Sequence, residues 1–136
     1  MPRYAALVDG KRGAYGVVIP DLPGCTAMGK TTDEALTNAA AAARAWAEVA
    51  KAEGMSIPKP RPVEVVRADP DVAAEIAEGA ALSIVPLVLD AGRSKAANLS
   101  LDAGLLQAID EAAEAKGLTR SAFIASAARE KILQDG

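Results

Sequence analysis

Three carboxylates and one thiol are the side chains that could do chemistry in this chain. Asp9 lies beside a predicted turn, Asp21 stands between two prolines, and Glu34 follows a pair of threonines. Carboxylates that converge on one or two hard cations would make a metal-dependent nuclease. Each of them also has an ordinary role in a turn or a helix cap, and Cys25 without a base partner is expected to be a small buried side chain. With no histidine in the chain, we predict no catalytic residue, no metal site and no cofactor.

A different kind of chemistry, base recognition, is suggested by residues 95–101. Positions 97, 99 and 101 are apolar and alternate with 96, 98 and 100, which is the period of two of a β-strand. On the second face the amide of Asn98 can pair with adenine, and the hydroxyl of Ser100 is a weaker reader. Arg93 and Lys95 would contribute mainly to phosphate attraction.

Two amphipathic helices are predicted after this strand. Asp102 offers an N-cap, apolar residues then repeat at helical spacing, and Gly117 supplies a helix stop. Thr119 or Ser121 can cap the second helix, whose apolar stripe runs from Phe123 to Ile132. The expected order in 93–136 is therefore strand, helix, helix.

A unit of roughly 40 residues with one unpaired strand rarely folds alone. Two copies could pair their strands antiparallel and pool four helices, which leaves 96, 98 and 100 on a ribbon that fits the DNA major groove. In this order of elements the segment resembles the ribbon-helix-helix repressors. The resemblance implies base contacts from Ala96, Asn98 and Ser100, and a phosphate contact at the start of the second helix, from Thr119, Arg120 and Ser121. Ala96 departs from the large polar or basic residue usual in that family.

Composition limits the class of protein. The chain has 136 residues, which suits one ordinary domain or two small ones. A single cysteine fits a reducing compartment, and there is neither an apolar run long enough for a bilayer nor an N-terminal signal segment, so we expect a cytoplasmic location and no membrane contact. The net charge of −3 arises in the first 92 residues, while 93–136 is balanced; an acidic front half suits a basic partner.

The first 90 residues predict an α+β domain. Strands are expected at 4–8, 15–19 and 25–28, the second and third joined by a rigid proline corner. Thr31 and Glu34 form a capping box for a helix that ends at Gly54. A proline-rich connector over 57–62, a short helix over 69–79 and an edge strand over 82–89 follow, and 90–92 is the expected hinge.

These elements closely resemble those of the HicB family of antitoxins. The sequence motifs that carry the resemblance are Ile19-Pro20-Asp21-Leu22-Pro23-Gly24-Cys25, then Gly29 and Asp33-Glu34-Ala35. The resemblance covers essentially the whole chain. It implies a partial ribonuclease-H-like domain over 1–90 that binds and neutralises a HicA-type toxin, a small basic ribonuclease that cleaves mRNA. It also implies a non-enzymatic chain whose 93–136 domain, as an intertwined homodimer, binds operator DNA and represses its own operon.

The toxin-facing surface is predicted at two places. One is the corner loop, taken as rigid and exposed, and the other is the acidic side of the long helix. The residues are Asp21, Leu22, Pro23, Cys25, Asp33, Glu34 and Glu48. A front domain that also self-associates would give a tetramer. The alternative is a ribbon-helix-helix repressor whose front domain senses a small ligand in a pocket that no motif announces.

Overall fold

The computed structural model describes residues 1–89 and 94–135 and divides the chain into two compact units, Met1–Leu89 and Asp90–Asp135. The predicted hinge at 90–92 and the candidate phosphate contact Arg93 lie outside the described residues. Each unit is treated separately below.

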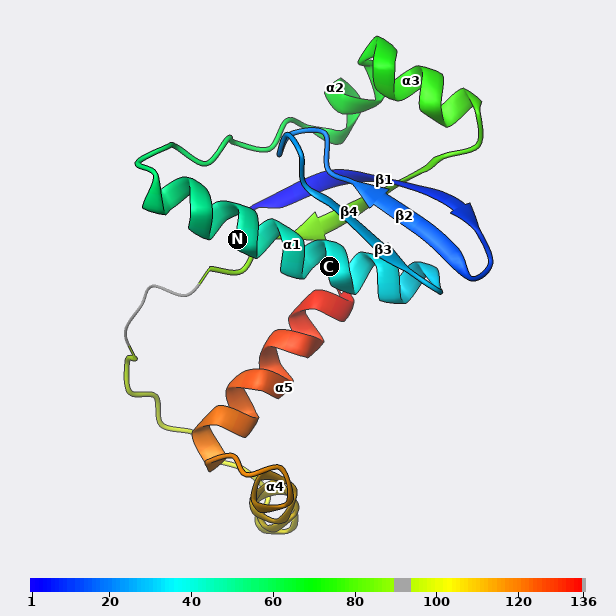
Figure 1. Cartoon of the computed structure of the whole chain (residues 1–136). Coiled ribbons are helices and arrows are strands. Elements are labelled where there is room, and N and C mark those ends of the chain that lie inside the picture. Colours follow the sequence, from blue (N-terminus) through cyan, green and yellow to red (C-terminus); the bar gives the residue numbers. More distant parts are fainter. Residues whose placement is uncertain (90–93, 136) are drawn as a thin grey trace. The chain divides into compact units, whose positions relative to one another are not determined.

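The first unit contains a four-stranded antiparallel sheet in the order β3-β2-β1-β4 (Figure 1). The strands are β1 (Arg3–Lys11), β2 (Ala14–Val18), β3 (Thr26–Gly29) and β4 (Ala81–Pro86). Leu7 of β1 pairs with Val18 on one side and with Leu82 on the other. The predicted hairpin, third strand and edge strand are confirmed within one or two residues at most ends. There are two exceptions: β1 extends to Lys11 rather than ending at residue 8, and β4 stops at Pro86 rather than at residue 89.

One face of the sheet is covered by α1 (Thr32–Ala52). The predicted capping box is present: Thr31 Oγ1 accepts from the Glu34 N–H at 3.1 Å, and the Glu34 carboxylate reaches back to the Lys30 N–H at 3.4 Å. Six alanines are buried along this helix. Their small size lets it lie close to the strands, and at Gly29 a side chain would collide with the backbone of Ala35.

The opposite face of β1 and β4 is covered by α2 (Val63–Ala68) and α3 (Pro70–Ala77). Ala5 and Leu7 of β1 pack there with Val66 and Val72. Residues Tyr4–Val8 are all buried, as expected for a strand covered on both faces. The short helix predicted near 69–79 is confirmed as α3, which Asp69 caps. No element was predicted for 63–68, where the structure has α2.

The second unit contains α4 (Ala103–Ala115) and α5 (Arg120–Asp135), as predicted. Asp102 caps α4 through the Leu105 N–H at 3.1 Å, and Gly117 ends it with a φ of 68°. The strand predicted over 95–101 is not formed in the single chain: residues 94–102 have no regular secondary structure. A lone strand has no neighbour to satisfy its backbone hydrogen bonds, which explains why a single copy does not form it.

Candidate functional site

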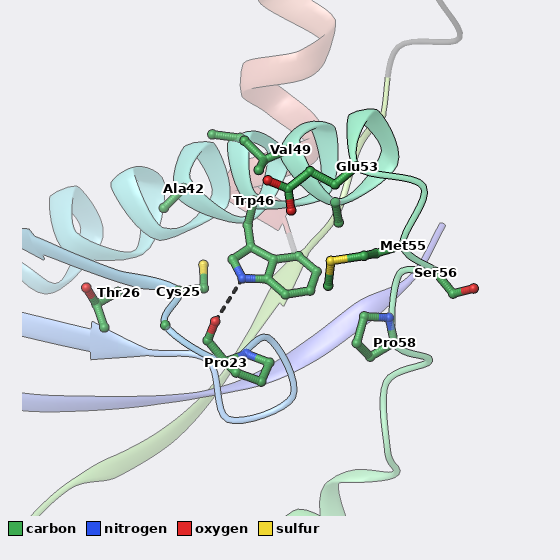
Figure 2. Close-up of a pocket in the computed structure, with 13 residues that line it drawn as sticks. Pro23, Cys25, Thr26, Ala42, Trp46, Val49, Glu53, Met55, Ser56 and Pro58 are labelled. Atoms are coloured by element: carbon green, nitrogen blue, oxygen red, sulfur yellow. Dashed lines mark hydrogen bonds between the residues drawn. The ribbon is translucent and has the colours of Figure 1, made fainter.

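The first unit has an apolar groove of about 660 Å³, called here the Trp46 groove (Figure 2). It lies between the outer side of α1, the loop before β3 and the segment that follows α1. Its lining residues are Pro23, Gly24, Cys25, Thr26, Ala42, Ala45, Trp46, Val49, Ala50, Glu53, Met55, Ser56 and Pro58.

The indole of Trp46 forms the centre of the groove wall. Its Nε1 donates to the carbonyl oxygen of Pro23 at 2.9 Å, which fixes the ring against the loop. Ala42 and Ala45, on the same side of α1, are too small to fill the space beside it. Val49 and Met55 are 58% and 53% exposed, so the groove is open to solvent and apolar.

A salt-bridge cluster holds the loop that contributes Pro23 and Cys25. Arg61 donates from Nε to Asp21 at 2.7 Å and from Nη1 to Asp69 at 3.2 Å. The hydrogen bonds that Arg61 donates to Asp21 and Asp69 raise the pKa of Arg61, and the bond from Arg61 is the largest cause that lowers the pKa of Asp69. The loop is therefore fastened to the connector and to the start of α3.

A second hydrogen bond holds the segment after α1, which forms the opposite wall of the groove. The Tyr4 hydroxyl donates to the carbonyl oxygen of Pro58 at 2.5 Å. Burial, and after it the charge of Asp21, raises the pKa of the Tyr4 phenol. Burial also raises the pKa of the Cys25 thiol, so this side chain is a wall element rather than an activated nucleophile.

The predicted exposure of the corner loop is wrong for three of its residues. The side chain of Asp21 is 6% exposed and engaged by Arg61, Leu22 is fully buried, and Cys25 is buried. The reason is that Leu22 packs inward while the Leu22 carbonyl accepts from the Cys25 N–H at 2.9 Å, folding the loop onto the core. Pro23 is exposed, as predicted.

The predicted acidic residues of α1 are exposed but differ in their engagement. Asp33 makes no side-chain bond within the described part of the chain, Glu34 serves the cap, and Glu48 pairs with Arg44 at 3.4 Å. The residues predicted from the sequence did not include Trp46, Val49 or Met55. The exposure of Val49 could have been expected, because Val49 lies outside the stripe of six buried alanines on α1.

The carboxylates considered for catalysis do not converge. Asp9 accepts from the Gly10 N–H at 2.7 Å, Asp21 binds Arg61, and Glu34 caps α1. Among residues 1–89 and 94–135 no cluster of His, Cys, Asp or Glu has the arrangement of a metal site. No helix in the described ranges has the length and apolar character to cross a membrane.

In the second unit, the candidate base readers are solvent-accessible. Lys95, Ala96, Asn98 and Ser100 are all exposed on the segment before α4. At the start of α5, Thr119 Oγ1 accepts from the Ala122 N–H at 3.1 Å, which confirms the predicted cap. Ser121 is exposed.

The candidate phosphate contact Arg120 already has an anionic partner. Its Nε and Nη2 donate to the two oxygens of Asp110, each at 2.8 Å. This bond lowers the pKa of Asp110 and raises that of Arg120. A phosphate at this helix start would meet a guanidinium that is shared with a carboxylate.

The same unit has an apolar hollow of about 390 Å³, called here the α4–α5 hollow. Leu99 at its edge is 62% exposed. Ala113 is the one buried hydrophobic residue among those described in this unit, so its core is largely open. The lining residues are Leu99, Leu101, Leu105, Ile109, Phe123, Ile124, Ala127 and Ala128.

An α+β domain with an open apolar groove is joined to a small helical unit with an uncovered core, and both features are typical of binding surfaces. The chain belongs to the HicB-like antitoxin family of bacterial toxin–antitoxin systems, because the model of that family matches residues 4–128. The mixed antiparallel sheet and helices match solved HicB structures.

Three relatives illustrate this similarity. The Burkholderia pseudomallei antitoxin HicB is 30% identical, with a TM-score of 0.57 over 94% of this chain and 96% of that one. The antitoxin HicB3 is 30% identical, with a TM-score of 0.54 over 96% and 98%. An uncharacterized 14.9 kDa protein from the rep-hol intergenic region of Haemophilus phage HP1 is 27% identical over 132 residues, 96% of this chain and 97% of the phage protein.

Proposed function

We propose that this chain is the antitoxin of a two-component system: its first unit binds and neutralises a HicA-type, mRNA-cleaving toxin in the cytoplasm, and its second unit binds operator DNA and represses the operon. The observation that carries the proposal is the family match over residues 4–128, which extends across both units. The first unit, a sheet covered by helices on both faces, is assigned as the partial ribonuclease-H-like domain. It acts by binding and not by catalysis.

Dimerisation through the second unit is supported by its open core. The α4–α5 hollow exposes leucines that a second copy would cover. In such a dimer the segments 95–101 would pair antiparallel and form the ribbon-helix-helix arrangement. Asn98 and Ser100 would then stand with Ala96 on the ribbon face toward the bases, with Lys95, Thr119, Arg120 and Ser121 near phosphates.

Toxin binding is supported by the charge and shape of the first unit. Asp33 is exposed and free to meet a basic protein, and Pro23 is exposed beside the Trp46 groove. Leu22 and Cys25 would contribute by shaping the loop rather than by contact, because they are buried.

The test is co-purification of this chain with the product of the adjacent small gene, followed by a ribonuclease assay on that product with and without this chain. A stable complex that silences cleavage is the expected result. A toxin that cleaves RNA equally well in excess of this chain would overturn the antitoxin assignment. Operator binding is tested by gel shift on the promoter fragment, with a shuffled fragment as control.

A ligand-sensing repressor is the second candidate, and the volume of the Trp46 groove favours it, since about 660 Å³ lies in the range of small-molecule sites. It predicts DNA binding without a protein partner. Intact operator binding together with no complex with the neighbouring gene product would favour this candidate over the antitoxin.

A further inference from the structure

The Trp46 groove is an exposed apolar hollow that the fold of the first unit does not need. Val49 and Met55 lie at its mouth with more than half of each side chain in solvent. Covering such side chains would be favourable, because it removes apolar surface from water. A continuous apolar hollow of this kind is typical of a binding surface.

The groove is formed before any partner arrives. The Trp46 indole is held by Pro23, the loop is held by Arg61 on Asp21, and the far wall is held by Tyr4 on Pro58. A groove wall that is already held by these three interactions loses little conformational freedom on binding, which favours affinity. Figure 2 shows the indole between α1 and the loop, with Met55 and Pro58 beyond it.

One acidic side chain, Glu53, marks the chemistry of the occupant. It is the one charged residue that lines the groove and is the C-cap of α1. A carboxylate at this end of a helix opposes the helix dipole. In the described part of the chain no ion pair or side-chain hydrogen bond engages it, so local stability does not account for its position. Beside an indole face, it suits a lysine or arginine.

We propose that the Trp46 groove receives a segment of the cognate toxin that presents an apolar side chain next to a lysine or arginine. The apolar side chain lies between Val49, Met55 and the indole, and the cation meets Glu53. This inference rests on the proposed function and names the surface and the chemistry through which the first unit holds its partner.

Four variants of the full chain test it, two in the groove and two matched controls. Val49→Glu puts a charge into the groove from an exposed position, and Val65→Glu does the same on α2, away from it. Glu53→Lys reverses the groove charge while favouring the helix dipole, and Glu75→Lys reverses a charge on exposed α3. Circular dichroism and thermal melting establish that each variant is folded.

The readout is the Kd for the toxin, by titration calorimetry. We expect both groove variants to weaken binding by about tenfold or more, as for central interface residues, and both controls to stay within about twofold of the parent chain. If the parent chain binds but the groove variants bind as tightly as the controls, the groove assignment is overturned and the antitoxin function stands. If the parent chain does not bind, the proposed function fails first.

A second readout uses the fact that Trp46 is the only tryptophan of the chain. Labelled with 5-fluorotryptophan, this chain gives one ¹⁹F resonance, and the unlabelled toxin gives none. Saturating toxin is expected to shift that resonance. A formed complex in which the resonance stays at its free position would overturn the groove assignment.

Discussion

Arg61 donates two hydrogen bonds to the carboxylate of Asp21. Its backbone nitrogen lies 2.8 Å from Oδ2, and its side-chain Nε lies 2.7 Å from Oδ1. The two residues are 40 positions apart in the sequence. This bond closes the loop before β3 onto the connector after α1, and it thereby fixes both sides of the Trp46 groove.

Removing the side-chain interaction between Arg61 and Asp21 should destabilise the first unit. Arg61→Ala leaves the nearly buried Asp21 carboxylate without its cation and is expected to lower the urea midpoint of unfolding. Arg67→Ala, an exposed arginine of α2, is the control and should leave the midpoint unchanged. Equal midpoints for the two variants would contradict a structural role for the Arg61–Asp21 pair.

Acid should remove part of the stability through Asp69. Its pKa is lowered in the fold, first by the Arg61 hydrogen bond, so its contribution is present above the ordinary carboxyl pKa of about 3.9 and is lost as pH falls through the lowered value. Asp69→Asn, which can still cap α3, should be less stable than the parent chain at pH 7 and should converge with it once the pH falls below that lowered pKa. A stability difference that does not change with pH would contradict this assignment.

The burial of Leu22 predicts a large packing effect. Leu22→Ala should lower the free energy of unfolding of the first unit by about 2–5 kcal/mol, because the side chain is fully buried. Pro23→Ala, its exposed neighbour, should change that energy far less. Chemical denaturation of both variants measures the difference, and similar losses would mean that Leu22 does not belong to the core.

In the second unit, substitutions of two exposed residues should affect DNA binding differently, one on operator DNA alone and the other on any DNA. Asn98→Ala is expected to weaken operator binding by about 1–3 kcal/mol with little change on random DNA. Lys95→Ala should weaken binding to both and flatten the salt dependence. Fluorescence anisotropy on operator and shuffled duplexes at several salt concentrations measures both effects. Equal losses on the two duplexes for Asn98→Ala would remove it from the base-reading residues.

The Asp110 partner of Arg120 should limit phosphate binding. Asp110→Asn removes the charge that holds the guanidinium and is expected to tighten operator binding, whereas Arg120→Ala should weaken it. Glu114→Gln removes the same charge from an exposed position of α4 and is the matched control. If Asp110→Asn tightens binding no more than Glu114→Gln does, Arg120 does not contact phosphate.

Elements with local signals could be predicted from the sequence. The Thr31–Glu34 capping box and the Gly117 stop depend on neighbours a few residues away, and both are present in the structure. The burial of the Asp21 side chain could not be read in this way, since it depends on Arg61, which lies 40 positions further along the chain. The α2 helix was missed because Val63, Val65 and Val66 are β-branched, and the burial of Val66 outweighs that preference.

Candidate sites were less predictable than elements, because a site depends on exposure. The corner motif pointed to the loop that lines the Trp46 groove, but the exposed apolar surface there belongs to Val49 and Met55 rather than to Asp21 and Cys25. The strand predicted over 95–101 is absent from the single chain; under the proposed function it would form only against a second copy, which one sequence cannot show.

Under the proposed function, the open α4–α5 hollow would link gene dosage to repression. A unit that completes its core only with a second copy gains stability as the chain becomes more concentrated. Under the proposed function, the amount of operator-binding dimer at low expression rises with the second power of chain concentration. Halving the supply of antitoxin would then lower repression more than proportionally, and the promoter would reopen to restore the supply.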